Sequence, residues 1–179
     1  MGTGILVCGL NGVGKSTLGK ALAKKMGYYF IDDEDLHFPG TDPLHTYASP
    51  RTRGEAEKLL LSEIATHENF IFASVKGDYG KAVLTSIHYA VLIDVPRDIR
   101  IQRVKERSYQ RFGSRMLPGG DLYEQEERFF DFVTSRAENT VEEWAKTLSC
   151  PIIRVDGTRP IAENINLIYS DFMEHILYF

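Results

Sequence analysis

The chain has little of several features that would assign it to a specialised class of protein. Its 179 residues include two cysteines, Cys8 and Cys150, which are too few and too far apart for a disulfide framework or a cysteine metal site. No apolar run approaches the length of a membrane span, and no basic segment followed by an apolar stretch opens the chain. The net charge of -4 disfavours a general nucleic-acid surface, which needs an excess of lysine and arginine. We therefore expect a cytoplasmic protein without a membrane or nucleic-acid partner.

The sequence also has no internal repeat, low-complexity tract or linker, and 43% of its residues are hydrophobic. One domain over residues 1–179, with a substantial core, is expected at this length. Short apolar runs alternate with segments of helical period. Strands are expected at 5–8, 28–31, 69–75, 89–95 and 152–155, and helices at 16–26, 52–67, 79–87, 97–109, 122–148 and 161–175. This alternation predicts an α/β fold in which helices cover both faces of a parallel sheet.

Residues 9–16, Gly-Leu-Asn-Gly-Val-Gly-Lys-Ser, match the pattern G-x-x-x-x-G-K-S. The match lies between an apolar strand and an amphipathic helix, which is the context that confirms it. Glycines there allow backbone N–H groups to converge on a phosphate at the positive end of the helix. Lys15 can reach the outer phosphates, and the Ser16 hydroxyl can ligate Mg²⁺. We therefore predict that a nucleoside triphosphate contacts Gly9, Asn11, Gly12, Val13, Gly14, Lys15, Ser16 and Thr17.

The same motif occurs in kinases, GTPases and mechanical ATPases, so other features must separate these classes. A GTPase should carry a base-reading segment of the Asn-Lys-x-Asp type, and the sequence contains none. A motor or helicase usually needs a longer chain and further motifs. A small phosphotransferase remains, with its site at the carboxyl ends of the parallel strands. The residues that fall at these ends are Gly9, Asp32, Ser74 and Asp94.

Four features, in chain order, resemble the adenylate-kinase-like small kinases, a group that includes adenylate kinase, shikimate kinase and gluconate kinase. They are the glycine-rich loop, the acidic residues 32–35, the pair Arg103 and Arg107, and the run Val-Asp-Gly-Thr-Arg-Pro at 155–160. The resemblance implies a three-layer α/β/α P-loop fold with five parallel strands in the order 2-3-1-4-5. It also implies ATP with Mg²⁺ as the phosphoryl donor and an acceptor-binding region at 36–68.

The resemblance implies roles for the basic residues near the nucleotide. Arg103 looks like the arginine that stacks on adenine, and Arg107 looks like the lid arginine that neutralises the transferred phosphoryl group. The lid would span residues 108–121 and close to exclude water. The residues that resemble the loop bordering adenine are Thr158, Arg159 and Pro160. Further phosphate contacts could come from Arg111, Arg115, Arg128 and Arg136, with Arg128 preferred to Arg136. The alternative for Arg103 and Arg107 is an exposed helix face on which they pair with neighbouring acids.

The acidic residues after the second strand separate two classes of acceptor. A nucleoside monophosphate is already anionic and needs no base, whereas a hydroxyl acceptor gains from a carboxylate that accepts its proton. Residues 30–37 resemble the corresponding stretch of shikimate and gluconate kinases, and His37 matches a gluconate-kinase histidine. We expect Asp32 to act as the base or as a partner of Mg²⁺-bound water, and Glu34 to grip acceptor hydroxyls. The alternative is a solvated acidic turn that caps a helix starting near Leu36.

The acceptor pocket is marked by fewer motifs. Arg51 and Arg53 could clamp a carboxylate or phosphate of the acceptor, or could lie in the first turns of a surface helix. Ser74 and Lys76 follow the third strand and echo the Ser-Ala-Leu-Lys run of gluconate kinases, although Lys76 could equally face solvent. Together these residues make a small, polar, anionic metabolite the expected acceptor.

We expect an enzyme that transfers the γ-phosphate of MgATP to a hydroxyl group. Its expected catalytic residues are Lys15, Asp32 and Arg107. One alternative is a nucleoside or nucleotide kinase of the same fold, which would be favoured by a base-sized aromatic slot built from Phe38, Tyr47 or Tyr79. A non-catalytic nucleotide-binding regulator is the alternative from another class. The oligomeric state stays open between monomer and homodimer.

Overall fold

The structure is a computed structural model that describes residues 2–39 and 50–177. Five parallel strands form one sheet in the order β2-β3-β1-β4-β5, which confirms the α/β fold and the predicted strand order. The strands are β1 (Gly4–Cys8), β2 (Tyr29–Asp32), β3 (Phe70–Ser74), β4 (Ile87–Asp94) and β5 (Ile152–Asp156). β1 lies in the middle of the sheet, and all of its residues are buried. A strand covered on both faces needs apolar side chains along its length, which explains the uninterrupted apolar run at 5–8.

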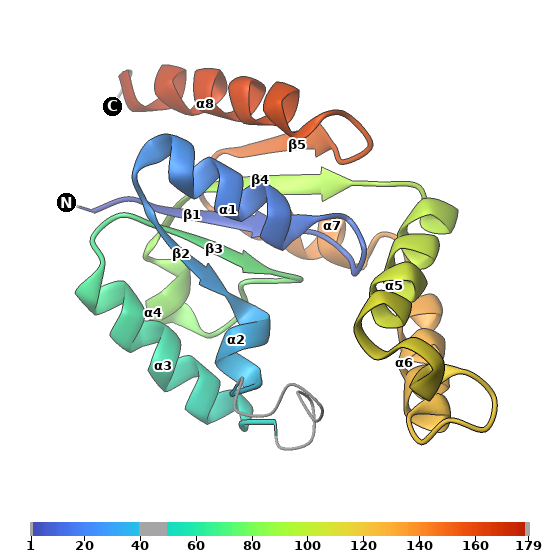
Figure 1. The fold of residues 1–179 in the computed structure, drawn as a ribbon. Coiled ribbons are helices and arrows are strands. Elements are labelled where there is room, and N and C mark those ends of the chain that lie inside the picture. Colours follow the sequence, from blue (N-terminus) through green and yellow to red (C-terminus); the bar gives the residue numbers. More distant parts are fainter. Residues whose placement is uncertain (1, 40–49, 178–179) are drawn as a thin grey trace.

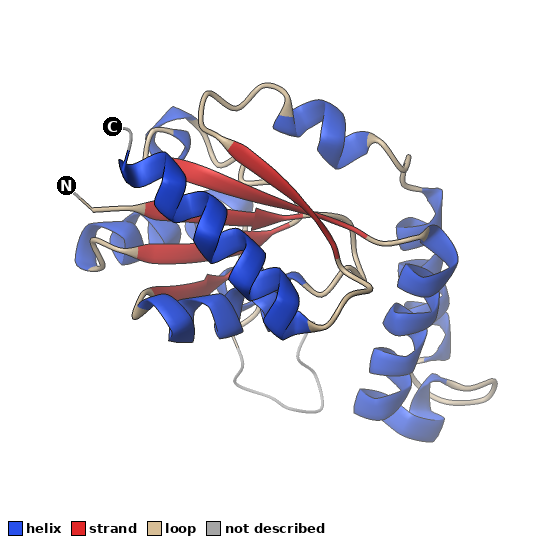
Figure 2. Cartoon of the chain, turned by 90° about the horizontal axis from the view of Figure 1, so that it is seen from above, coloured by secondary structure: helices blue, strands red, loops and turns tan. Residues whose placement is uncertain are grey.

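Helices cover both faces of the sheet (Figures 1 and 2). They are α1 (Lys15–Met26), α2 (Asp33–His37), α3 (Arg53–Thr66), α4 (Lys81–Leu84), α5 (Arg97–Phe112), the 3₁₀ helix η1 (Gly113–Met116), α6 (Tyr123–Ser135), α7 (Thr140–Ala145) and α8 (Ile161–Leu177). α1 and α8 lie on one face, and α4 and α7 lie on the other. α5 and α6 lie side by side beyond the carboxyl ends of the strands. This helix pair therefore borders the edge of the sheet at which ligands bind in such folds.

Two helix ends follow directly from local sequence signals. α1 ends at Gly27, which has a φ of 70° and donates its backbone N–H to the carbonyl of Ala23. Glycine takes this left-handed conformation without the steric cost of a side chain. α3 begins after Thr52, whose hydroxyl accepts the N–H of Glu55 at 3.3 Å, while the Glu55 carboxylate accepts the N–H of Thr52 at 2.8 Å. This reciprocal pair is a capping box, and it fixes the start of the helix.

The hydrophobic core has two separate parts. The larger part is centred on the sheet, where Leu6, Ile71 and Val91 are fully buried on neighbouring strands. The smaller part lies between α5 and α6. Its buried residues are Val104, Phe112, Met116, Phe130 and Val133. The α5–α6 pair is therefore held together by a small core of its own and not by the core of the sheet.

One predicted helix is wrong, because residues 122–148 form two helices instead of one. The backbone turns at Arg136, which has an extended conformation with φ -64° and ψ 132°. Arg136 at this break donates to the Asn11 side chain in the glycine-rich loop, and Glu138 accepts from Arg100, which itself donates to the Asn11 carbonyl. The predicted long helix is therefore interrupted at the point where Arg136 binds to the glycine-rich loop.

Two shorter segments also differ from the sequence prediction. The helix expected at 79–87 is reduced to α4, and Ile87 belongs to β4. The predicted lid at 108–121 is helical through Phe112 and continues as η1. Phe112 and Met116 are buried against α6, so apolar packing orders the first part of the predicted lid.

Part of the predicted acceptor-binding region, including Tyr47, lies outside the described residues. Within residues 2–39 and 50–177, no helix combines the length and the apolar character needed to cross a membrane.

Candidate active site

The glycine-rich loop joins β1 to α1 and depends on glycine at two positions. Gly12 has a φ of 86°, and a Cβ atom there would lie 2.4 Å from the Arg100 carbonyl oxygen. Gly14 has a φ of 94° and caps α1 without a side-chain hydrogen bond. The N–H groups of the first turn of α1 are therefore left for an anionic ligand at the positive end of the helix.

Two arginines support the loop: Arg100, which is buried on α5, and Arg136, which is half-buried at the end of α6. Arg100, which is 2% exposed, donates to the Asn11 carbonyl at 3.1 Å and to both carboxylate oxygens of Glu138 at 2.7 Å. Arg136 donates to the Asn11 side chain at 3.0 Å. Burial lowers the pKa of Arg136 from its ordinary value. These contacts fix the Asn11 part of the loop from both its carbonyl and its side chain.

Lys15 lies at the start of α1 and lines the cavity in front of the loop. Its ammonium donates to the Leu10 carbonyl at 3.1 Å. Burial and, to a smaller extent, the nearby Arg107 guanidinium lower the pKa of Lys15 to about 8. An anionic phosphate would relieve both effects, because it would pair with the charged ammonium.

A cavity of about 260 Å³ lies on one side of the loop. Its walls include Gly14, Thr17, Arg103, Gly157 and Arg159. Both terminal N–H groups of Arg103 donate hydrogen bonds to the Gly157 carbonyl at 3.2 Å. These bonds fix the guanidinium plane beside the glycine-rich loop. This is the place that the sequence predicts for adenine.

Residues 158–160, which the resemblance places beside adenine, lie next to this cavity, but not all of them line it. Thr158 donates its N–H and its hydroxyl to Asp156, at 2.8 and 2.6 Å. The predicted contacts Thr158 and Pro160 are absent from the described cavity wall, whereas Arg159 is part of it. The predicted adenine loop is therefore adjacent to the cavity and contributes one side chain to it.

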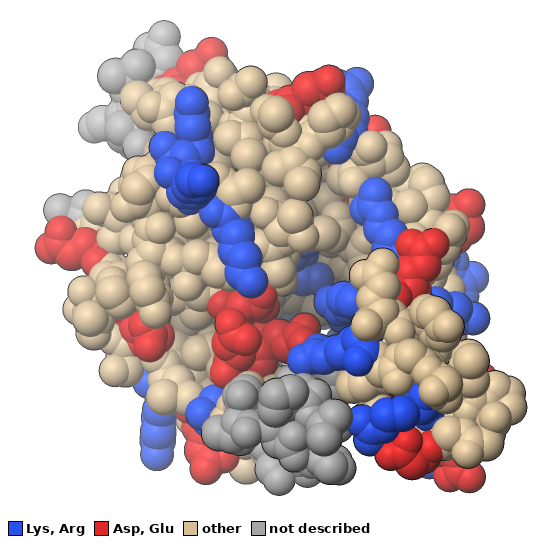
Figure 3. Space-filling model, viewed as in Figure 1, with Lys and Arg blue, Asp and Glu red and all other residues tan. Residues whose placement is uncertain are grey.

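A larger cavity of about 580 Å³ opens on the other side of the loop. Asn11, Gly12, Lys15 and Ser16 form its floor, and β3, α2, α5 and α6 contribute its walls. Figure 3 shows that acidic side chains gather near the middle of this face, with basic side chains next to them. A phosphate-binding floor and carboxylates in one cavity are the elements of phosphoryl transfer to a hydroxyl.

Asp32 lies at the carboxyl end of β2 and lines this cavity. One carboxylate oxygen accepts the N–H of Glu34 at 3.1 Å and caps α2. The alternative of a helix-capping acid is thus also correct, although the helix starts at Asp33 and not near Leu36. In residues 2–39 and 50–177, no hydrogen bond or ion pair engages the other oxygen of Asp32, which leaves it available to a ligand.

Asp33 is the centre of a hydrogen-bond network that the sequence did not indicate. Its carboxylate accepts the Ser74 hydroxyl at 2.9 Å and the Tyr79 hydroxyl. The Tyr79 oxygen lies 2.6 Å from Nε2 of His37. Burial raises the pKa of Asp33, with a further contribution from Asp32. The network fixes the side chains of His37 and Ser74, which both line the cavity.

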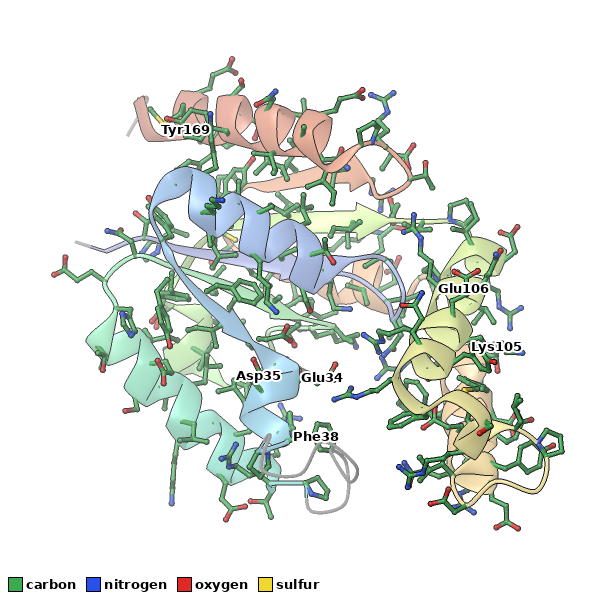
Figure 4. The ribbon with its side chains drawn as sticks, in the orientation of Figure 1. Glu34, Asp35, Phe38, Lys105, Glu106 and Tyr169 are labelled. Atoms are coloured by element: carbon green, nitrogen blue, oxygen red, sulfur yellow. The ribbon has the colours of Figure 1, made fainter. Side chains whose placement is uncertain are left out.

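Glu34 connects the acidic segment to α5. It points from α2 toward α5, whereas Lys105 and Glu106 lie on the far side of that helix (Figure 4). The Glu34 carboxylate is 3.3 Å from Arg111 and 3.9 Å from Arg107. The predicted phosphoryl-binding arginine and the predicted acceptor-binding acid are therefore ion-paired with each other on the cavity wall.

The far wall of the cavity combines aromatic rings with two polar side chains. Phe112 and Ser108 come from α5, Phe129 and Glu126 come from α6, and Phe38 closes the opposite side. The aromatic slot proposed from sequence included Phe38 and Tyr79. Phe38 does line the cavity, but Tyr79 is absent from its described wall and binds Asp33 and His37 instead.

Comparison with known families decides how this site is classified. Residues 5–128 match the AAA domain family. This range includes the glycine-rich loop, the acidic segment and most of the cavity wall from α5 and α6. The chain belongs to the AAA domain family.

Relatives of this AAA domain chain include proteins with and without a stated activity. It is 29% identical over 174 residues to the uncharacterised protein YqaC of Bacillus subtilis, covering 92% of this chain and 94% of that protein. It is 31% identical over 80 residues to a shikimate kinase of Synechococcus elongatus, which covers 42% of each chain.

Solved structures of small-molecule kinases share its fold. A gluconokinase from Sinorhizobium meliloti superimposes with a TM-score of 0.61 at 20% identity, over 99% of this chain and 96% of that one. A shikimate kinase from Acinetobacter baumannii in complex with shikimate gives 0.58 at 16% identity, over 97% and 94%. The predicted P-loop kinase fold is confirmed by these matches.

Several predicted acceptor residues of this AAA domain lie away from the described cavity wall. Arg51 donates to the carbonyls of Asp35 and Leu36, at 3.2 and 3.0 Å, and so closes the end of α2. Arg53 donates to the Asp78 carbonyl. Neither arginine lines the described cavity, and Lys76 does not line it either.

Two other predicted phosphate contacts are engaged elsewhere. Arg115 pairs with Asp121 at 2.7 Å. The Arg128 side chain is 73% exposed and lies 3.8 Å from Glu124. Arg136, and not Arg128, is the one that reaches the loop. Sequence spacing could not show this, since it depends on the break between α6 and α7.

Proposed function

We propose that the chain transfers the γ-phosphoryl group of ATP to a hydroxyl of a small polar metabolite. The supporting observation is that Lys15 and Asp32 line one cavity, the first from the phosphate-binding loop and the second from the carboxyl end of β2. This arrangement fits a donor phosphate on one side and an acceptor hydroxyl on the other. It also fits the cytoplasm, where ATP is abundant and cysteines stay reduced.

The nucleotide would occupy the loop and the smaller cavity. Its phosphates would meet the N–H groups of Gly12, Gly14 and Thr17 and the ammonium of Lys15, while adenine would lie between Arg103 and the loop at 157–160. The remaining proposed contacts are Gly9, Asn11, Val13, Thr158, Arg159 and Pro160. The Ser16 hydroxyl oxygen suits Mg²⁺, and the ion would neutralise charge on the phosphates.

The acceptor would lie in the larger cavity, close to Asp32. Its hydroxyl proton would pass to the Asp32 carboxylate as the hydroxyl oxygen bonds to the γ-phosphorus and the bond to the ADP oxygen breaks. Arg107 would stabilise charge on the transferred group. Ser74 and Glu34 are the acceptor contacts predicted from sequence that line this cavity. Arg51 and Lys76 have no such position, so the acceptor need not be anionic.

A nucleoside kinase is the second candidate, and a specific observation favours it. Phe38, Phe112 and Phe129 all line the acceptor cavity. Aromatic faces stack on flat rings, and a nucleobase would present such a ring. A non-catalytic nucleotide-binding regulator is the third candidate.

Coupled ADP release from ATP and Mg²⁺ distinguishes these candidates. The panel would contain sugar acids, neutral polyols and sugars, shikimate-like acids, and nucleosides. Release stimulated by one class of acceptor is the expected result. Slow hydrolysis that no acceptor stimulates would favour the regulator. The Asp32→Asn variant must lose the stimulated rate while it still binds ATP; stimulated release at the wild-type rate would exclude Asp32 as the base.

A further inference from the structure

Glu126 is a charged residue in a position that normally holds an apolar one. It lies on α6 at the spacing that places it on the same face as Phe130 and Val133, both of which pack against α5. The residue is 2% exposed. It lines the 580 Å³ cavity together with Ser108 and Phe129. A carboxylate therefore lies at the boundary between a small core and the larger cavity.

Among the described residues, no group satisfies one oxygen of the Glu126 carboxylate. Its Oε2 atom is buried and has no hydrogen-bond partner in the part of the chain that the structure describes. No ion pair with another described residue involves it either. Buried carboxylates without partners are costly, so such a group persists when a ligand supplies the missing bonds.

The surroundings of Glu126 indicate what kind of ligand group could reach it. Phe112, Phe129 and Phe38 border the same cavity and offer flat apolar surfaces. A carboxylate or phosphate of the ligand would be repelled by Glu126, while an O–H or N–H group would donate to it. Arg111, a predicted anion-binding group on the same cavity wall, is already 3.3 Å from Glu34.

Resting on the kinase function above, we propose that Glu126 binds the acceptor. The acceptor is a ring that packs against the phenylalanines and carries a hydrogen-bond donor at the end remote from its phosphorylated hydroxyl. This chemistry belongs to sugar or polyol rings, through O–H groups, and to amino-bearing nucleosides, through N–H groups. Sugar acids with a carboxylate at that end are poor acceptors.

The test compares wild type with Glu126→Gln, which keeps the shape of the side chain and removes its charge. Initial rates with MgATP are measured for neutral ring sugars, amino-bearing nucleosides and sugar acids, and the melting temperature is measured with each compound alone. The best donor-bearing acceptor is expected to lose about tenfold or more in kcat/KM in the variant. The rate with sugar acids is expected to stay the same or rise. The class of donor-bearing compound that the enzyme phosphorylates, sugar or nucleoside, identifies the kind of ring that binds at Glu126.

Two controls separate binding from a structural role. Glu127→Gln changes the neighbouring, exposed position of α6 and should leave kcat/KM unchanged. The melting temperature of ligand-free Glu126→Gln should equal or exceed that of wild type, because an unpaired buried charge has been removed. A lower melting temperature would show that Glu126 has a structural partner, and the inference would be wrong. Equal kcat/KM values in wild type and variant would also overturn it, while leaving the kinase function intact.

Failure of the kinase function gives a different pattern. In that case no compound stimulates ADP release from wild type. The melting temperatures then decide whether Glu126 binds a ligand. A donor-bearing ring compound that raises the melting temperature of wild type, but not that of Glu126→Gln, supports the binding site. The absence of any such rise overturns both.

Discussion

The two sides of the glycine-rich loop are built in different ways. On the nucleotide side, the groups offered to a ligand are largely backbone N–H groups and arginines fixed to carbonyls, such as Arg103 on Gly157. On the acceptor side, they are side chains from α2, β3, α5 and α6, which are far apart in sequence. Backbone groups tolerate sequence change, whereas side chains do not. The first side is therefore generic to the fold, and the second side is where this chain acquires its specificity.

The two sides also differ in what holds them in place. The loop is anchored to the core of the sheet and to buried Arg100. The acceptor wall belongs partly to α5 and α6, whose small core is separate from that of the sheet. Regions with few buried apolar contacts open at lower free energy. Changes at the loop should thus alter chemistry or stability strongly, and changes at the acceptor wall should alter substrate choice.

The largest effect is expected from Lys15→Ala. Removal of the ammonium takes away the positive charge closest to the outer phosphates and should lower kcat by about 10³-fold or more. Lys20→Ala, on the exposed part of α1, is the matched control and should retain activity. Steady-state ADP formation measures both variants. Near-normal turnover of Lys15→Ala would mean that the loop does not bind the reacting phosphates.

Asp32→Asn should produce a smaller effect, confined to the acceptor side. The amide cannot take the hydroxyl proton, so kcat should fall by about 10²-fold while the Kd for ATP stays unchanged. Asp35→Asn, exposed on α2, serves as the control. Parallel losses in ATP affinity and turnover would place Asp32 on the nucleotide and not on the acceptor.

Arg100→Met tests how much the buried Arg100, which supports the glycine-rich loop, contributes to the stability of the fold. The substitution leaves the Asn11 carbonyl without a donor and removes the buried partner of the half-exposed Glu138, and should lower the free energy of unfolding by about 1–3 kcal/mol. Arg97→Met is the comparison, because Arg97 lies 3.6 Å from the same Glu138 but is largely exposed. It should cost less than about 1 kcal/mol. Urea unfolding measures both, and equal losses would show that burial of Arg100 is unimportant.

The smallest effect concerns pH. Lys15 has a pKa of about 8 in the free protein, and phosphate binding should raise it. Below pH 8 the Lys15 ammonium is already charged in the free protein, so Lys15 contributes no pH dependence to ATP affinity there. Above pH 8 binding must take up a proton, and affinity should fall by up to about tenfold per pH unit. Calorimetry at pH 8.5 in two buffers of different ionisation enthalpy should detect the uptake, and Lys15→Ala should abolish it.

The sequence was sufficient for the fold and for the phosphate loop because both depend on residues close together in the chain. The apolar runs and the helix stop at Gly27 specify the strand and helix order locally. The loop motif places Lys15 and Ser16 by sequence spacing alone. Asp32 could be placed beside the loop because parallel strands bring their carboxyl ends to one edge.

The acceptor wall could not be predicted in the same way. Whether Asp32 or Asp33 faces Ser74 depends on where β2 ends and α2 begins, and that boundary cannot be read to one residue. Arg136 reaches the loop only because the predicted long helix breaks. A usable signal existed for Glu126, since the apolar period of Phe130 and Val133 places it on the inner face. Its role as a wall of the cavity still required the position of α6.

The contact of Glu34 with Arg107 and Arg111 has a kinetic consequence. Before nucleotide arrives, this carboxylate gives the two guanidinium groups the negative charge that a triphosphate would later provide. An incoming γ-phosphate would compete for the same cations and release Glu34 toward a second substrate. Turnover would then follow a compulsory order, with the donor first and the acceptor second, set by one acidic side chain that changes partners.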